Sequence, residues 1–329
     1  MISLNRLEEI ENNFSNHKIA IIGDMMLDGY YWGDVSRVSP EAPVPVVEIE
    51  NEFFRFGGAA NVAYNINKLG GISLPIGIIG NDTDGETFLK LMEKEEINNS
   101  GIFKDNSRPT TTKTRVIAGK QHVVRIDKES KIYLSNNFEQ KIIEYLLQNI
   151  NSISAIILQD YNKGVLTEYL IDQIIKLANE NNIIITVDPK FINFKKFQNV
   201  TLFKPNRKET EDILGIRINS DKEISFAGNK LLEILKAKYV LITLGEKGIA
   251  LFENGDKEIR IPTKARKVAD VSGAGDTVIS TLSLALASGA SIVEAAYIAN
   301  FAAGIVCEEV GIVPIEKAKL FNIIRESLK

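Results

Sequence analysis

The chain has 329 residues, of which 44% are hydrophobic and 25% charged, and its formal net charge at pH 7 is −4. This length suits one large α/β unit or two smaller ones, and the mildly acidic balance argues against a nucleic-acid partner. Cys307 is the single cysteine, which excludes a disulfide framework and fits a reducing, cytoplasmic setting. The sequence also lacks a secretory core and an apolar run of the roughly 18 residues that a membrane span needs, so we expect no membrane contact.

Residues 19–27, IAIIGDMML, form the first strongly apolar run, which predicts a buried strand that opens into a loop. Ligands of open parallel sheets bind beyond the carboxyl ends of the strands. Asp28, just past this run, is therefore a candidate to bind sugar hydroxyls, and Asp24 is a weaker one. A turn-forming aspartate beside a glycine is an equally good interpretation of either residue.

Two regions, about residues 32–54 and 108–128, have sequence patterns typical of extended segments rather than helices. The first places prolines among β-branched residues, and the second predicts a turn at Gly119 and Lys120. Together they predict a small β-sheet, built from insertions, that covers a site as a lid. The alternative is a passive edge or a contact between subunits, and a homodimer through this sheet is a hypothesis.

Residues 56–70, FGGAANVAYNINKLG, predict a helix that begins after paired glycines. Gly57 and Gly58 permit close backbone approach, and Asn61 offers donors and acceptors to a polyol. A generic glycine-rich helix start is the alternative.

From Phe138 onward helices and strands alternate, which predicts a doubly wound α/β fold around a mostly parallel sheet. With no internal hinge, residues 1–329 are expected to form one domain. Helices are expected from Phe138 to about Ile150, over Glu168–Asn181 and over Ala227–Leu235, and strands over Ala155–Gln159, Ile183–Val187, Val200–Phe203, Tyr239–Leu244 and Ile249–Phe252.

Polar residues follow several of these strands, so they are expected at one edge of the sheet, where a nucleotide, a magnesium ion and an acceptor would meet. Mg²⁺ prefers oxygen ligands and keeps several waters, so Glu209 is a candidate to act through its hydration shell. The alternatives to a binding role are a helix start with a solvated charged turn for NRKE at 206–209 and a hairpin for TLGEKG at 243–248. The residues of this group are Asp160, Asn162, Lys163, Asp188, Lys190, Asn206, Glu209 and the segment Thr243–Gly248.

The stretch 270–277, DVSGAGDT, runs directly into an apolar helix-forming segment. The first N–H groups of a helix lack internal partners, so the loop of Gly273, Ala274 and Gly275 predicts a phosphate site on bare backbone. Asp276 is then placed to take a proton from a hydroxyl that attacks the phosphate. A simple helix cap is the alternative.

These motifs resemble the ribokinase or PfkB family of carbohydrate kinases over essentially the whole chain, with GGAAN at 57–61 and DVSGAGDT as its two signatures. The resemblance implies a ribokinase-like fold with a small β-sheet lid. It implies that Asp276 is the base, that the amides from Gly273 to Asp276 form an anion hole, and that ATP and Mg²⁺ are used, while a monovalent cation stays open. It assigns Asn206, Glu209, Thr243, Gly245, Gly248 and Asn300 to the nucleotide, Glu209 also to the metal, and Asp28, Gly57, Gly58 and Asn61 to the sugar.

Within that family, GDMMLDGYYWGDVSRVSPEAPVPVVEI at 23–49 and DYNKG at 160–164 are similar to the D-glycero-D-manno-heptose 7-phosphate kinases. That resemblance implies phosphorylation of the anomeric hydroxyl, for lipopolysaccharide-core synthesis. Met26, Asn162 and Val271 depart from the usual residues of the family or subgroup. Only the kinase portion is matched, so adenylyl transfer is expected to belong to another protein.

A phosphorylated acceptor needs cations at its far end, and an arginine that binds the phosphate with two hydrogen bonds would suit it best. A solvated surface charge is the alternative for each candidate cation. The alternatives to this function are a kinase of another sugar, such as fructose or ribose, and a catalytically silent sugar-nucleotide sensor. Beyond the motifs, Asp160, Lys163 and Arg125 are the substrate candidates. The cations considered for the phosphate are Arg37, Lys113, Arg115, Arg125, Lys163 and Lys190.

Overall fold

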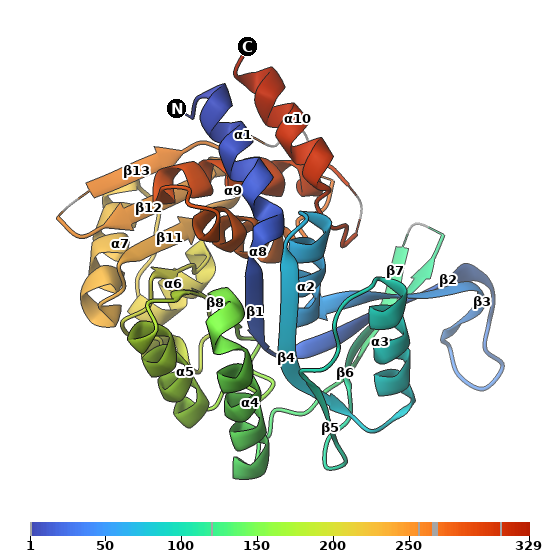
Figure 1. Ribbon diagram of the computed structural model, residues 1–329. Helices are drawn as coiled ribbons and strands as arrows, with labels where there is room; N and C mark the ends of the chain where they lie inside the picture. The colour runs from blue at the N-terminus through green and yellow to red at the C-terminus, as the bar shows by residue number, and fades with distance from the viewer. Residues whose placement is uncertain (1, 120, 256, 265–268, 310) are drawn as a thin grey trace.

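The computed structural model describes residues 2–119, 121–255, 257–264, 269–309 and 311–329. Its centre is a twisted sheet of the order β13-β12-β11-β10-β9-β8-β1-β4-β5, in which β12 pairs antiparallel with both its neighbours and the remaining pairs are parallel (Figure 1). The strands are β1 Lys18–Gly23, β4 Ile72–Gly80, β5 Ile102–Asp105, β8 Ile153–Gln159, β9 Ile184–Asp188, β10 Leu202–Phe203, β11 Tyr239–Thr243, β12 Ile249–Glu253 and β13 Lys257–Ile261.

Helices cover both faces of this sheet because its strands are apolar on both sides. Along β1, Ile19 and Ile21 belong to one core cluster, whereas Ala20 and Ile22 belong to the other. This arrangement confirms the predicted doubly wound α/β fold. The first face carries α1 Leu4–Asn13, α2 Ala59–Lys68, α3 Thr83–Lys94, α8 Ala274–Ala287, α9 Ile292–Cys307 and α10 Lys317–Ser327, and the second carries α4 Asn136–Asn149, α5 Glu168–Glu180, α6 Arg207–Leu214 and α7 Asp221–Leu235.

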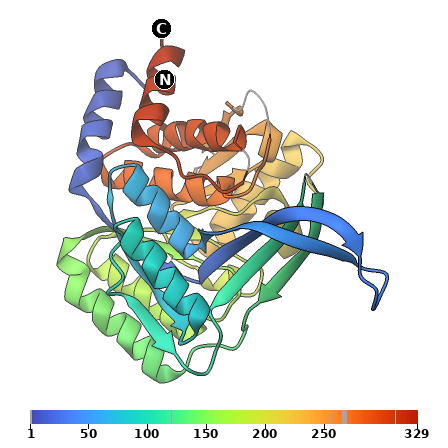
Figure 2. The same cartoon turned by 90° about the vertical axis from the view of Figure 1, so that its right-hand side faces the viewer.

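A second, small sheet projects from the body beside α2 and α3 (Figures 1 and 2). Its order is β3-β2-β6-β7, with β2 and β6 parallel and the two outer pairs antiparallel. The expected turn at Gly119 and Lys120 lies between β6 and β7, although Lys120 itself is outside the described residues. The strands are β2 Met25–Val38, β3 Pro45–Gly58, β6 Thr111–Ala118 and β7 Gln121–Lys128.

One predicted strand is wrong in its extent. The apolar run 19–27 is split at Asp24, where the chain leaves the central sheet as β1 and enters the small sheet as β2. Both pieces are buried, so their hydrophobicity hides the break. Asp28 consequently lies inside a strand of the small sheet, and that sheet begins seven residues before the predicted Trp32.

Within the described residues, no helix combines the length and the apolar composition needed to cross a membrane.

Candidate active site

The buried helix α8 begins at the carboxyl edge of the central sheet. Gly273 is its N-cap, with φ = +80°, a conformation that favours glycine. Ala274 N–H donates to the Val271 carbonyl at 3.2 Å, so this amide of the predicted anion hole is already engaged. The helix geometry therefore leaves the amides of Gly275 and Asp276 to receive an anion.

Asp276 is held by donors from three different elements. Its Oδ2 accepts from Asn61 Nδ2 at 2.8 Å, while its Oδ1 accepts from Gln159 Nε2 at 3.0 Å and from the Tyr161 hydroxyl at 2.9 Å. The residue is 5% exposed. These bonds fix the carboxylate between α2 and the loop after β8.

Burial is the main cause that raises the pKa of Asp276, to about 6. The hydrogen bond from Asn61 lowers this pKa, the nearby Asp188 raises it, and Tyr161 and Lys204 lower it. A carboxylate with a pKa close to the working pH is well suited to accept a proton from an alcohol.

Lys204 and Asp188 form a buried ion pair beside the helix start. Lys204 Nζ lies 2.9 Å from Asp188 Oδ2, with the two side chains 3% and 9% exposed. A Cβ placed on Gly275 would lie 3.6 Å from that Nζ, so the ammonium group lies beside the glycine backbone. The helix start thus has a fixed cation next to its free amides.

Two adjoining cavities bring the predicted nucleotide residues together with α8. A cavity of about 660 Å³ is lined by Asn206, Glu209 and Asp276, and one of about 530 Å³ is lined by Gly248 and Asn300. The residues that line both are Thr243, Gly245, Val271 and Gly275.

Asn206 and Glu209 cap α6 reciprocally, which bears out the helix-start alternative for NRKE. The Asn206 side chain accepts from Glu209 N–H at 2.8 Å, and Glu209 Oε2 accepts from Asn206 N–H at 2.9 Å. Glu209 also pairs with the Lys190 ammonium. Its carboxylate therefore lines the cavity in a fixed orientation.

A divalent cation fits the donor set of this cavity. The carboxylates of Asp188 and Glu209 line it and are hard oxygen donors. Among the described residues, no group of three or more His, Cys, Asp or Glu side chains is close enough to form a metal cage. Because Mg²⁺ keeps several of its waters, two carboxylates beside the cavity suit a largely hydrated ion.

The predicted sugar residues gather on the other side of Asp276. Asn61 touches Asp276 directly, and Gly57 and Gly58 lead into its helix. A Cβ on Gly57 would lie only 2.3 Å from Asp28 Oδ2. Glycine at this position of β3 therefore leaves room for the Asp28 side chain of β2. Burial raises the pKa of Asp28, against the opposing effect of Arg115.

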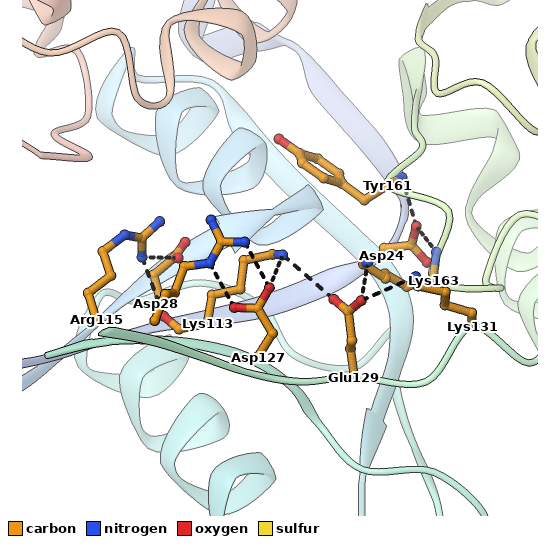
Figure 3. Close-up of polar contacts among 10 residues, drawn as sticks. Asp24, Asp28, Lys113, Arg115, Asp127, Glu129, Lys131, Tyr161 and Lys163 are labelled. Atoms are coloured by element: carbon orange, nitrogen blue, oxygen red, sulfur yellow. Dashed lines mark hydrogen bonds and ion pairs between the residues drawn. The ribbon is translucent and has the colours of Figure 1, made fainter. Parts of the chain in front are cut away.

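A row of charged side chains lies on one face of the small sheet, on the side toward Tyr161 (Figure 3). The register pairs Asp28 with Lys113, Lys113 with Asp127, and Arg115 with Arg125, so these side chains share a face. The pairs that neutralise them are Arg115–Asp28 at 2.5 Å, Lys113–Asp127 at 3.5 Å, Arg125–Asp127 at 2.9 Å and Lys163–Glu129 at 2.7 Å.

The two remaining candidate cations lie elsewhere. Lys190 pairs with Glu209 on the nucleotide side, and Arg37 is exposed near the far end of β2.

Asp24 and Asp160 are buried and support the loop after β8. Asp24 is 1% exposed and accepts from the backbone N–H groups of Tyr161, Lys163 and Val165. Asp160, also 1% exposed, accepts from Asn162 N–H and Asn193 Nδ2. The two oxygens of Asp160 thus hold the loop, and its assignment to the substrate stays a prediction.

Asn162 has φ = +54°, which explains why asparagine can replace the glycine usual in the resembling subgroup. Asparagine is one of the few residues other than glycine that adopt the left-handed region readily.

Sequence reasoning missed Gln159, Tyr161 and Lys204 as parts of the site. Each has a polar side chain at or just past the carboxyl end of a strand, within two residues of a predicted site residue. A buried polar residue that ends an apolar strand, such as Gln159 after AIIL, is the signal that was available.

Comparison with known proteins agrees with this architecture. The sequence profile of the pfkB family carbohydrate kinases matches residues 16–318. The "Bifunctional protein HldE" of Desulfatibacillum aliphaticivorans is 42% identical over 93% of this chain, and that of Helicobacter pylori strain HPAG1 is 42% identical over 89%. The chain spans 63% of the length of each of these relatives.

Solved structures share the fold at lower identity. Escherichia coli phosphofructokinase-2 in complex with potassium superposes with a TM-score of 0.77 at 20% identity, over 95% of this chain and 99% of that one. Arabidopsis thaliana ribokinase complexed with ribose and ATP gives a TM-score of 0.74 at 19% identity, over 94% and 99%. With a family match over most of its length and relatives above 40% identity, the chain belongs to the pfkB family of carbohydrate kinases.

Proposed function

We propose that the chain transfers the γ-phosphoryl group of ATP to the anomeric hydroxyl of D-glycero-D-manno-heptose 7-phosphate. The product, heptose 1,7-bisphosphate, would serve ADP-heptose and lipopolysaccharide-core synthesis in the cytoplasm. The observation that carries the proposal is a buried carboxylate, Asp276, that lines a nucleotide-sized cavity and accepts a hydrogen bond from Tyr161, which lies on the side of the charged face of the small sheet (Figure 3). The HldE relatives and the resemblance of residues 23–49 to heptose 7-phosphate kinases support the choice of sugar.

Each side of Asp276 has its own task in this reaction. The cavity lined by Asn206, Glu209 and Thr243 would hold ATP, with its transferring phosphate at the amides of Gly275 and Asp276. Glu209 and Asp188 would hold Mg²⁺ through its waters, and the ion supplies charge that offsets the phosphates. Asp276 would take the proton of the attacking hydroxyl.

The cations of the small sheet would bind the phosphate at the far end of the sugar. Arg115, Arg125 and Lys113 lie on the same face as Asp28, which would bind sugar hydroxyls with Asn61. Asp127, the carboxylate partner of Arg125 and Lys113, is partly exposed, so an incoming phosphate can exchange with it, whereas Asp28, the partner of Arg115, is buried. In this proposal the small sheet is the lid of the site.

An acceptor panel tests the substrate. In a coupled assay of ADP release, heptose 7-phosphate should exceed unphosphorylated heptose, fructose and ribose in kcat/KM by about 10²-fold, since two charge-assisted hydrogen bonds are lost without the phosphate. Preference for an unphosphorylated hexose would contradict the proposal and favour a fructokinase-like or ribokinase-like function. ATP binding without turnover of any acceptor would favour a silent sensor. Repeating the assay with and without K⁺ tests the monovalent cation that the sequence leaves open.

The reverse face of the small sheet is the basis for a proposed homodimer. Residues alternate along β7, so Val124 and Ile126, 50% and 53% exposed, lie opposite the face of Arg125 and Asp127. Apolar side chains at this exposure suit a contact with a second copy. Light scattering should show a dimer that Val124→Asp together with Ile126→Asp converts to a monomer. A wild-type monomer at working concentration would contradict the proposal.

A further inference from the structure

The loop that follows β8 is held by hydrogen bonds and an ion pair within the protein. Asp24 accepts three of its backbone N–H groups, from Tyr161 at 2.8 Å, Lys163 at 3.1 Å and Val165 at 3.1 Å. The Lys163 side chain is tied at 2.7 Å to Glu129, which follows β7 (Figure 3). The backbone of Tyr161 is therefore anchored to the central sheet, and its neighbour Lys163 to the small one.

The side chain of Tyr161 points away from this anchor and reaches Asp276. Its hydroxyl donates to Asp276 Oδ1 at 2.9 Å, and Lys190 Nζ lies 5.4 Å from the centre of its ring. Tyr161 lines the same 660 Å³ cavity as Asp276 and Glu209. The ring thus contacts Lys190 over its face while its hydroxyl contacts the Asp276 carboxylate.

The two oxygens of Asp276 are not equivalent in this arrangement. Oδ1 receives two donors, from Tyr161 and from Gln159, and the same Gln159 Nε2 lies 3.3 Å from Asp188 Oδ2. Among the described residues, Oδ2 receives one, from Asn61 on the sugar side. A carboxylate oxygen has about two lone-pair positions, so Oδ1 is filled and Oδ2 keeps one free.

We propose that Tyr161 is a positioning residue: together with Gln159 it saturates Oδ1 of Asp276 and leaves Oδ2 as the oxygen that takes the acceptor's proton. This inference rests on the proposed role of Asp276 as the base. In the step, the acceptor O–H bond breaks and its proton goes to Oδ2. The acceptor oxygen bonds to the γ-phosphorus, and the bond from that phosphorus to the bridging oxygen of ADP breaks.

The charged groups that face Asp276 predict the sign of a Tyr161 substitution. Asp188, at the end of β9, raises the pKa of Asp276, whereas Lys204, after β10, lowers it, and Lys190 lies across the Tyr161 ring. The Tyr161 hydroxyl also lowers this pKa, since it donates to the charged form. Removing the hydroxyl alone should raise it.

The experiment compares Tyr161→Phe with wild type in the pH dependence of kcat/KM, using any acceptor that wild type turns over. The acid limb, near pH 6 in wild type, should move up by about one pH unit, so that kcat/KM falls about tenfold at pH 5.5 and changes little at pH 8.5. Gln159→Leu should move the limb in the same direction.

Tyr64→Phe is the matched control. The Tyr64 hydroxyl also donates to a carboxylate, that of Glu95, at 2.9 Å, and it makes no bond to Asp276. Its profile should coincide with that of wild type. Thermal melts of all variants show whether the fold is intact.

Two results would overturn the proposal: an unmoved limb in Tyr161→Phe, or a loss of equal size at every pH. The Asp276→Asn variant distinguishes the two possible failures. If Asp276 is not the base, Asp276→Asn stays active; if only the role of Tyr161 is wrong, Asp276→Asn is still inactive. A measurement without substrate is also decisive. Infrared difference titration of wild type against Asp276→Asn locates the carboxyl midpoint, which must rise in Tyr161→Phe for the proposal to hold.

Discussion

The two walls of the active site hold their charges differently. On the central wall, formed by the central sheet and the start of α8, Asp276, Asp188 and Lys204 have side chains buried to more than nine-tenths, and each has protein partners in place. On the small sheet, Arg115 and Lys113 are about one-fifth exposed and Arg125 is 57% exposed.

This difference assigns different tasks to the two walls. Breaking a buried charged pair leaves an uncompensated charge in the low-dielectric interior, so the charged groups of the central wall cannot exchange partners at low cost. Partly exposed pairs contribute little to stability and can give up one partner for another. We therefore expect the central wall to set the rate of the chemical step and the small sheet to set acceptor affinity.

The largest expected effect is that of Asp276→Asn. The substitution removes proton acceptance while it keeps the shape of the side chain, so kcat should fall about 10²- to 10⁴-fold. The melting temperature should change little. Asp34→Asn, on an exposed position of β2, is the control and should retain full turnover. Near-normal turnover of Asp276→Asn would show that the central wall does not carry the chemistry.

Asp24→Ala should cost the most stability among substitutions near the site. It leaves three backbone N–H groups of the loop without their acceptor, and each such loss costs about 1–3 kcal/mol. Urea unfolding should show a decrease of about 3 kcal/mol or more, whereas Asp34→Ala should stay close to wild type. A small decrease for Asp24→Ala would mean that the loop is not fixed by this carboxylate.

Most of the fold could be predicted from the sequence, because its strands and helices follow patterns that depend on near neighbours. The runs Ala155–Gln159 and Tyr239–Leu244 agree with β8 and β11 to within two residues. The break at Asp24 could not be predicted, since it depends on a carboxylate that binds backbone groups some 140 residues later in the chain.

The candidate site shows the same limit. The resemblance assigns Asp276 to the base and Asn61 to the sugar, and the structure places Asn61 Nδ2 2.8 Å from Asp276 Oδ2. Gln159 and Tyr161 flank the selected Asp160, yet it is their side chains that touch Asp276, since neighbouring residues of a loop point in different directions. Which member of a polar cluster faces the site is decided by packing, not by the motif.

The pH profile of wild type tests the state of the central wall. Burial raises the pKa of Asp276 to about 6, and the base acts only when it is deprotonated. The kcat/KM should therefore be constant at high pH and fall about tenfold per unit as the pH drops below about 6. A profile that stays flat down to pH 4.5 would indicate an ordinary, solvent-exposed carboxylate.

The smallest expected effects come from the small sheet, where two substitutions should act in opposite directions. Arg125→Gln removes a cation that would bind the acceptor's phosphate, so the KM for heptose 7-phosphate should rise about tenfold with kcat retained. Asp127→Asn removes the carboxylate that now pairs with Arg125 and Lys113, so it should lower that KM. Arg37→Gln, near the far end of β2, should leave it unchanged. Since exposed charges are screened by salt, the difference between Arg125→Gln and wild type should shrink at high ionic strength. If both Arg125→Gln and Asp127→Asn changed kcat and left KM alone, the assignment of affinity to the small sheet would be wrong.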